Sequence, residues 1–87
     1  MIHVLIRHKV ADFTAWKTAY DSHAGARQSA GLKEKQVLRS IADPNEVVIL
    51  LTADDLHKAQ AFAGSPDLRE AMQKAGVIDK PDVYFLS

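Results

Sequence analysis

The sequence predicts an α+β fold in which strands and helices follow one another in the order βαββαβ. Four short segments have strand character, two longer segments have helical periodicity, and turn or capping residues separate them. With right-handed crossovers, this order gives a ferredoxin-like plait: an antiparallel sheet whose first and third strands are central, with the helices on one face. The 87 residues are expected to form one domain, residues 1–87.

The first strand and the first helix have clear boundaries. Residues 2–9, IHVLIRHK, are the first strand, and Asp12 is the expected N-cap of a helix over residues 13–30. Gly31 follows that helix at the position where glycine favours the left-handed conformation of a C-terminal cap.

Three further strands are predicted over residues 32–41, 46–53 and 83–86. The turn ADPNE, residues 42–46, joins the first two into a hairpin, because proline and asparagine favour turns. The run VVILL makes the strand over residues 46–53 the most apolar of the three.

The second helical segment has two parts. Asp54 or Asp55 caps the first part, which Gly64 interrupts. Ser65 is the expected N-cap of the second part, since Pro66 follows at the first helical position. Because these two parts and the first helix cover only one face of the sheet, the other face lacks a helical cover.

Side chains alternate between the two faces of a strand, so the residues of each strand can be assigned to one face of the sheet or the other. The aliphatic sets belong under the helices, namely Val4, Ile6, Val47, Ile49 and Leu51. His8 shares this face, and we expect it to reach solvent near the end of the sheet.

The opposite face carries an apolar patch without a helical cover. The patch comprises Leu5, Val48 and Leu50. An exposed patch of this kind marks an interaction surface, and a second copy of the chain, packed sheet to sheet about a two-fold axis, is the expected cover. The chain is therefore predicted to form a homodimer.

The first helix has an apolar stripe that also carries polar residues. It comprises Phe13, Trp16, Ala19, Tyr20, His23, Ala24, Arg27 and Ala30. Trp16 lies near its centre and should be buried. His23 and Arg27 are adjacent on the helix surface, so they either reach solvent at the edge of the stripe or border a polar cavity.

These segments resemble one superfamily over nearly the whole chain. The helix ADFTAWKTAYDSHAGARQSAG, the hairpin DPNEVVILL and the segment SPDLREAMQKAGV resemble the dimeric α+β barrel proteins, especially small bacterial members called cyclase-like or antibiotic-biosynthesis-monooxygenase-like. The resemblance implies a two-fold dimer that closes an α+β barrel. The superfamily includes cofactor-independent monooxygenases of aromatic polyketides, haem-degrading enzymes, lactone isomerases and proteins of no known activity.

The resemblance assigns no catalytic residue. Its monooxygenases use an Asn, a Trp and an Arg around the cavity, but the single Trp16 and the single Asn45 of this chain lie at other positions. The ligand-binding candidates are therefore polar residues on the two faces described above: His3, Arg7, Thr52, Tyr84, His23 and Arg27.

Two locations for a ligand site compete. His3 and Arg7, with Thr52 and Tyr84 as neighbours, are favoured, since a guanidinium can bind a carboxylate or phenolate and an imidazole can act as a base. In the structural alternative, Arg7 pairs with an acidic residue such as Glu34. His23 and Arg27 are expected to be structural, as are the aromatic residues of the first helix.

Composition excludes several classes of function. Lys and Arg total 11 against 11 Asp and Glu, so nucleic acid is not an expected partner. No cysteine is present, the four histidines have no metal-ligand spacing, and VVILL is too short to span a membrane. We expect no metal, no cofactor and a cytoplasmic location.

Three functions remain open. One is a cofactor-independent monooxygenase or cyclase-like enzyme that acts on an aromatic or polyketide-like substrate. Another is a non-catalytic dimer, ligand-binding or stress-related, that holds a small hydrophobic molecule. Both of these require a pocket, whereas the third, a purely structural dimer module, does not.

Overall fold

The computed structural model describes residues 1–87 and has the ferredoxin-like order that the sequence predicts. Its strands are β1 (Ile2–Lys9), β2 (Leu32–Arg39), β3 (Glu46–Ala53) and β4 (Asp82–Leu86). Its helices are α1 (Phe13–Ser22), α2 (Ala24–Ser29), α3 (Leu56–Ala63) and α4 (Pro66–Lys74). β2 ends two residues earlier than expected, and the first predicted helix is divided in two.

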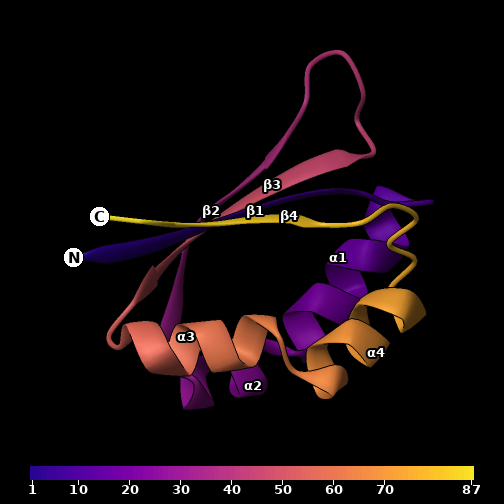
Figure 1. Ribbon diagram of the computed structural model, residues 1–87. Helices are drawn as coiled ribbons and strands as arrows, with labels where there is room; N and C mark the ends of the chain where they lie inside the picture. Colours follow the sequence, from indigo (N-terminus) through magenta and orange to yellow (C-terminus); the bar gives the residue numbers. More distant parts are fainter.

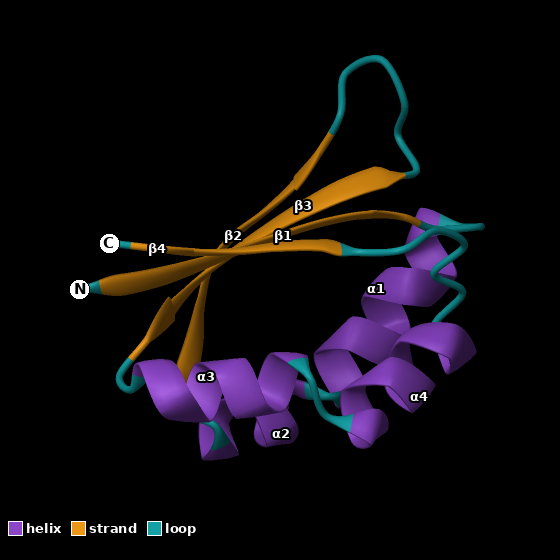
Figure 2. Ribbon diagram, in the orientation of Figure 1, coloured by secondary structure: helices purple, strands orange, loops and turns teal.

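The four strands form one antiparallel sheet in the order β2-β3-β1-β4, which confirms that β1 and β3 are central. All four helices lie on one face, and the β2–β3 hairpin rises away from them (Figure 1). The other face has no helix over it (Figure 2). β2 contains an irregularity between Glu34 and Gln36, where its register against β3 shifts.

The core lies between the sheet and the helices, as the alternation of side chains predicts. Val4, Ile49 and Leu51 are at most 4% exposed, and Val47 is fully buried. His8 lies on the same face, but the expectation that it reaches solvent is wrong, because its exposed fraction is 2%. The chain that follows α4 closes this end of the sheet by pairing with the residues beyond β1, through a Val10–Val77 bridge.

The first helical segment breaks at His23, which sequence periodicity does not show. The His23 N–H bonds the Tyr20 carbonyl, and the Arg27 guanidinium donates a second hydrogen bond to the same oxygen through Nη1, at 2.8 Å. A cation at a helix C-terminus compensates carbonyl groups that lack an intrahelical partner. Arg27 thus stabilises the end of α1 from within α2.

The predicted caps determine where the other helices begin and end. Asp12, Asp55 and Ser65 each accept a hydrogen bond from the backbone N–H three residues later. Of the two aspartates considered for α3, Asp55 is therefore the cap. Gly31 and Gly76 have positive φ angles of 75° and 87°, which side-chain-bearing residues rarely adopt. No helix is long and apolar enough to cross a membrane.

Candidate functional site

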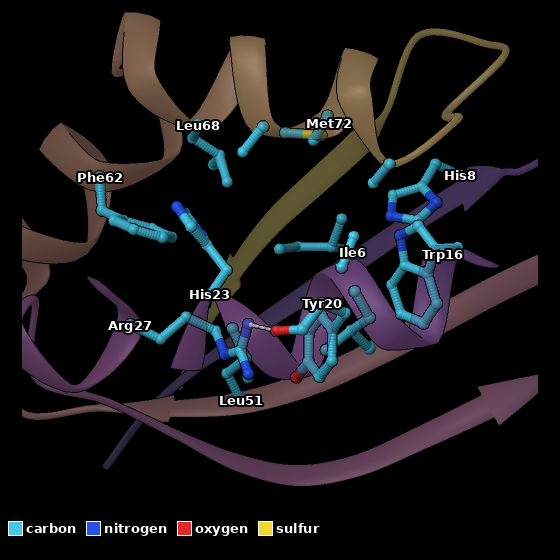
Figure 3. Close-up of a pocket in the computed structure, with 14 residues that line it drawn as sticks. Ile6, His8, Trp16, Tyr20, His23, Arg27, Leu51, Phe62, Leu68 and Met72 are labelled. Atoms are coloured by element: carbon cyan, nitrogen blue, oxygen red, sulfur yellow. Dashed lines mark hydrogen bonds between the residues drawn. The ribbon is translucent and has the colours of Figure 1, made fainter. Parts of the chain in front are cut away.

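A cavity of about 60 Å³ lies between the helices and the sheet (Figure 3). Its floor is formed by Ile6, Ile49 and Leu51, and its roof includes Leu68 and Met72 of α4. Eleven of its 14 lining residues are hydrophobic. The cavity is therefore suited to an apolar group rather than to an ion.

Aromatic side chains of α1 form one wall of the cavity. The rings of Trp16 and Tyr20 stack with centroids 4.8 Å apart and planes 24° apart. Phe13 extends the row on the far side of Trp16, at 5.8 Å. Trp16 is 3% exposed, which confirms that the centre of the predicted stripe is buried. Because the ring faces cover one another, these residues contribute apolar area to the wall rather than free surfaces for stacking.

Arg27 and His23 also line the cavity, although the sequence favoured the opposite face of the sheet for a ligand. The Arg27 Cζ lies 3.6 Å from the centroid of the Tyr20 ring, and the residue is 8% exposed. The His23 ring lies 6.3 Å from Phe62, between α1 and α3. The Arg27 guanidinium contacts both the ring and the carbonyl of Tyr20, and its structural role stays a prediction.

Two residues of the cavity lining each carry a buried polar atom that has no hydrogen-bond partner. These are His8 Nδ1 and the Tyr20 hydroxyl. Burial lowers the pKa of His8, and burial raises the pKa of Tyr20, so both groups favour their neutral forms. Unpartnered buried polar groups are rare in folded proteins and call for an explanation.

The candidates on the helix-free face lie outside the cavity described above. His3 of β1 pairs with Thr52 of β3, and Leu5, the next β1 residue on the same face, pairs with Tyr84 of β4. Tyr84 is 54% exposed in the single chain, so one subunit alone does not enclose its side chain. The structure brings His3, Thr52 and Tyr84 onto one face, and their binding of a ligand stays a prediction.

Arg7 is held by three carboxylates rather than by Glu34, the example named from the sequence. Its Nε donates to Asp82 at 2.9 Å, Nη1 donates to Glu46 at 3.0 Å, and Nη2 donates to Asp79 at 3.3 Å. The hydrogen bond to Asp82 is the main cause that raises the pKa of Arg7. Three of the five N–H groups of the guanidinium have partners within the chain, so two remain for a ligand.

Asp79 connects the chain after α4 to β1. One carboxylate oxygen accepts the Lys9 N–H at 2.7 Å, and the other pairs with Arg7. The Lys9 hydrogen bond is the main cause that lowers the pKa of Asp79 below its ordinary value of 3.8. A carboxyl whose pKa is depressed by folding stabilises the protein above its unfolded pKa, and this contribution is lost as the pH falls through the folded pKa.

Asp79→Asn is therefore expected to lower the free energy of unfolding at pH 7. The difference from wild type should shrink as the pH falls below about 4, because asparagine resembles the protonated carboxyl. Urea denaturation at pH 7, 4 and 2.5 measures this. Asp54→Asn, at an exposed carboxylate without an ion pair, is the matched control. An equal loss at every pH would contradict the electrostatic origin of the effect.

Sequence reasoning missed the cavity-facing role of His8. The alternation of β1 placed His8 under the helices, but nothing in the sequence showed that the Trp16 ring would pack against it. The available sign of its burial was that a polar residue shares a strand face with Val4 and Ile6.

Comparison with solved structures confirms the class of fold, a βαββαβ chain like those of several proteins described as antibiotic biosynthesis monooxygenases. No family model and no curated protein matches the sequence. The likeness to solved structures lies at 11–18% identity among those compared, so it concerns the fold alone.

Three solved structures illustrate the likeness. A Bordetella bronchiseptica protein provisionally described as an antibiotic biosynthesis monooxygenase has a TM-score of 0.79 and 15% identity, covering 99% of this chain and 94% of that one. SnoaB, a cofactor-independent oxygenase from Streptomyces nogalater, has a TM-score of 0.75 and 11% identity, with 99% and 90% covered. A conserved Methanosarcina mazei protein has a TM-score of 0.73 and 12% identity, with 98% and 89% covered.

Proposed function

We propose that this protein is a homodimer in which each subunit binds a small, mainly apolar, ring-bearing molecule in the cavity between the sheet and the helices. The observation that carries the proposal is the lining of that cavity. An aliphatic floor from the sheet faces stacked aromatic rings from α1, and few polar groups interrupt them. Ligand pockets in proteins have this character.

The helix-free face supports the dimer. One row of neighbouring side chains across this face comprises Tyr84 of β4, Leu5 of β1 and Leu50 of β3. The next row includes Val48 of β3 and Leu38 of β2. Leu38 is 50% exposed and Leu86, at the edge, is 46% exposed, whereas the aliphatic residues of β1 and β3 that face the helices are nearly inaccessible. A second copy packed on this face would remove the apolar row from water.

α4 is the element that would admit a ligand. A cavity of about 150 Å³ is known to hold benzene, so the 60 Å³ present here must enlarge for a ring to enter. α4 contains no buried residue, and its ion pair, between Glu70 and Lys74, is internal to the helix. Displacing α4 outward therefore breaks few contacts.

Ring binding can be tested by NMR titration of the ¹⁵N-labelled protein with toluene. We expect shifts of the Trp16 indole and of the Ala71 and Met72 amides. Ala71→Leu adds three carbons at the roof of the cavity and should weaken toluene binding at least about tenfold by filling the space. Ala61→Leu makes the same change at an exposed position of α3, outside the cavity.

Unchanged binding in Ala71→Leu would place the ligand elsewhere. Loss of binding in both variants would point to a general effect of the substitution on the helices. Mass spectrometry of the denatured wild-type protein would in addition identify any molecule that co-purifies.

A catalytic function is the second candidate. Its support is the likeness in fold to a cofactor-independent oxygenase, together with a neutral imidazole in the cavity lining. The substrate would be an aromatic or polyketide-like molecule. Oxygen uptake in the presence of the co-purified molecule, without added cofactor, would support an oxygenase, whereas binding without uptake would support the non-catalytic dimer.

A further inference from the structure

Arg27 is a buried cation for which the chain supplies no counter-charge. The residue is 8% exposed, and its guanidinium takes part in none of the ion pairs of the structure. Its hydrogen bond, from Nη1 to the Tyr20 carbonyl, is the dashed line in Figure 3. Buried charges in proteins are ordinarily paired, because an unpaired one loses its hydration without compensation. A single neutral acceptor does not balance the charge of Arg27.

The side edge of the Arg27 guanidinium, formed by Nε and Nη2, has no partner in the chain. The fully enclosed polar side-chain atoms that lack a partner are His8 Nδ1 and the Tyr20 hydroxyl, and neither nitrogen of this edge is among them. The edge therefore borders accessible space. Cζ lies 3.6 Å from the centroid of the Tyr20 ring, and this contact holds the guanidinium in place. Two parallel N–H groups on a fixed edge match the two oxygens of a carboxylate.

Arg27 also lines a second space, a cleft of about 310 Å³ between the end of α1, α2 and the start of β2. Arg27 is the only residue that this cleft shares with the cavity of the proposed function. Seven residues line the cleft, and only two of them are hydrophobic. Its polar lining residues other than Arg27 are exposed, including Gln28 and Lys33. The cleft thus has a buried cation at its base and a polar rim.

The two acidic residues of the cleft do not serve as the missing counter-charge. Asp21 pairs with Lys17, one turn earlier in α1. Glu34 is exposed and takes part in no ion pair. With Asp21 balanced by Lys17, the lining holds two cations, Arg27 and Lys33, against Glu34 alone. This balance suits a ligand with one negative charge, because Glu34 would repel a dianion more strongly.

We propose that the cleft is a binding site for a small molecule that carries a single carboxylate, and that the Nε–Nη2 edge of Arg27 receives this carboxylate through two parallel hydrogen bonds. Lys33 adds positive charge at the rim. The inference goes beyond the proposed function, because the ring cavity and the cleft are separate spaces. Failure of toluene to bind in the cavity would leave the carboxylate site standing.

Acetate and acetamide are the probes, because they share a shape and differ in charge. An NMR titration of the ¹⁵N-labelled protein at constant ionic strength follows the Arg27 Nε–H resonance and the Gln28 amide. We expect a saturable shift with acetate and binding at least about tenfold weaker with acetamide, the effect of a charge-assisted hydrogen bond. The Nε–H of Arg69, an exposed arginine of α4, is the internal control and should not saturate.

Substitutions of Arg27 test the fork directly. Arg27→Lys retains the charge but loses the parallel donors, so acetate should bind about 3- to 10-fold more weakly. Arg27→Gln removes the charge and should abolish the saturable shift of the Gln28 amide. Both variants also disturb the hydrogen bond to the Tyr20 carbonyl, so a variant that leaves Arg27 in place is needed as well.

Glu34→Gln is that variant, because it removes a negative charge from the rim and leaves Arg27 intact. Acetate affinity should rise about 2- to 3-fold, and resistance to urea should stay at the wild-type level. Glu70→Gln, at an exposed carboxylate of α4 outside the cleft, should leave acetate affinity unchanged.

Two results would overturn the proposal. A loss of stability in Glu34→Gln, with no saturable shift of the Arg27 Nε–H in wild type, would show that Glu34 is the counter-charge of Arg27 in solution. Equal, unsaturated shifts of the Arg27 and Arg69 resonances would show only the weak pairing that any exposed cation has with acetate.

Discussion

Replacing Trp16 with alanine is expected to lower the free energy of unfolding by about 3–5 kcal/mol, the usual range for large aromatic truncations in protein cores. Trp16 contacts Phe13, Tyr20 and the His8 ring at once, and it is almost completely buried. No neighbour can move into its place without breaking this stack. A protein of 87 residues has little stability in reserve, so the variant should be largely unfolded at 37 °C.

Thermal and urea denaturation followed by circular dichroism measure the loss, since the variant lacks the fluorescent residue. Trp16→Phe should retain part of the stability because a ring remains in the stack. Thr14→Ala, on the exposed side of α1, is the control. A Trp16→Ala protein that unfolds within about 1 kcal/mol of wild type would show that α1 packs differently against the sheet.

Replacing Leu50 with aspartate is expected to convert the proposed dimer into monomer or to cause aggregation. Leu50 lies in the central row of the helix-free face, between Leu5 and Gln36 in the register. A two-fold interface would bury this position in both subunits, so each dimer would bury two carboxylates without partners. Sedimentation at micromolar concentration should show mass near one chain for the variant and two for wild type.

Leu56→Asp is the matched control for Leu50→Asp. Leu56 is an exposed leucine that begins α3, on the side of the molecule away from the helix-free face. Its substitution should leave the mass at two chains. A wild-type protein that sediments as a monomer would refute the interface itself, whereas dissociation of both variants would show that added negative charge rather than position is responsible.

The sheet could be predicted from the sequence because period-two alternation is a local signal. The buried face of β3 can be identified from the spacing of Val47, Ile49 and Leu51 alone. The caps at Asp12 and Ser65 are equally local, because each bonds a backbone N–H within the first turn of its helix. The fold class follows from the order of these local signals.

The site could not be predicted to the same extent, because it depends on contacts between distant residues. The buried ring of His8 lies against Trp16 of α1, and the three partners of Arg7 come from β3, β4 and the loop before β4. The break at His23 is likewise invisible to helical periodicity, which continues in phase across it. Alternation placed each side chain on the correct face, but distant chain segments decided which face encloses a cavity.

The irregular strand β2 limits the ways in which this protein can associate. β2 is an edge strand, and its first half presents the exposed residues Lys33, Glu34 and Lys35 together with the shift in register. Charged side chains and a local distortion on an edge strand discourage a strand of another chain from adding to the sheet. Growth of the sheet into fibres is therefore disfavoured at this edge, while the apolar row on the face stays available. Association through a face about a two-fold axis ends at two copies, so the distortion of β2 favours a closed assembly over growth of the sheet at this edge.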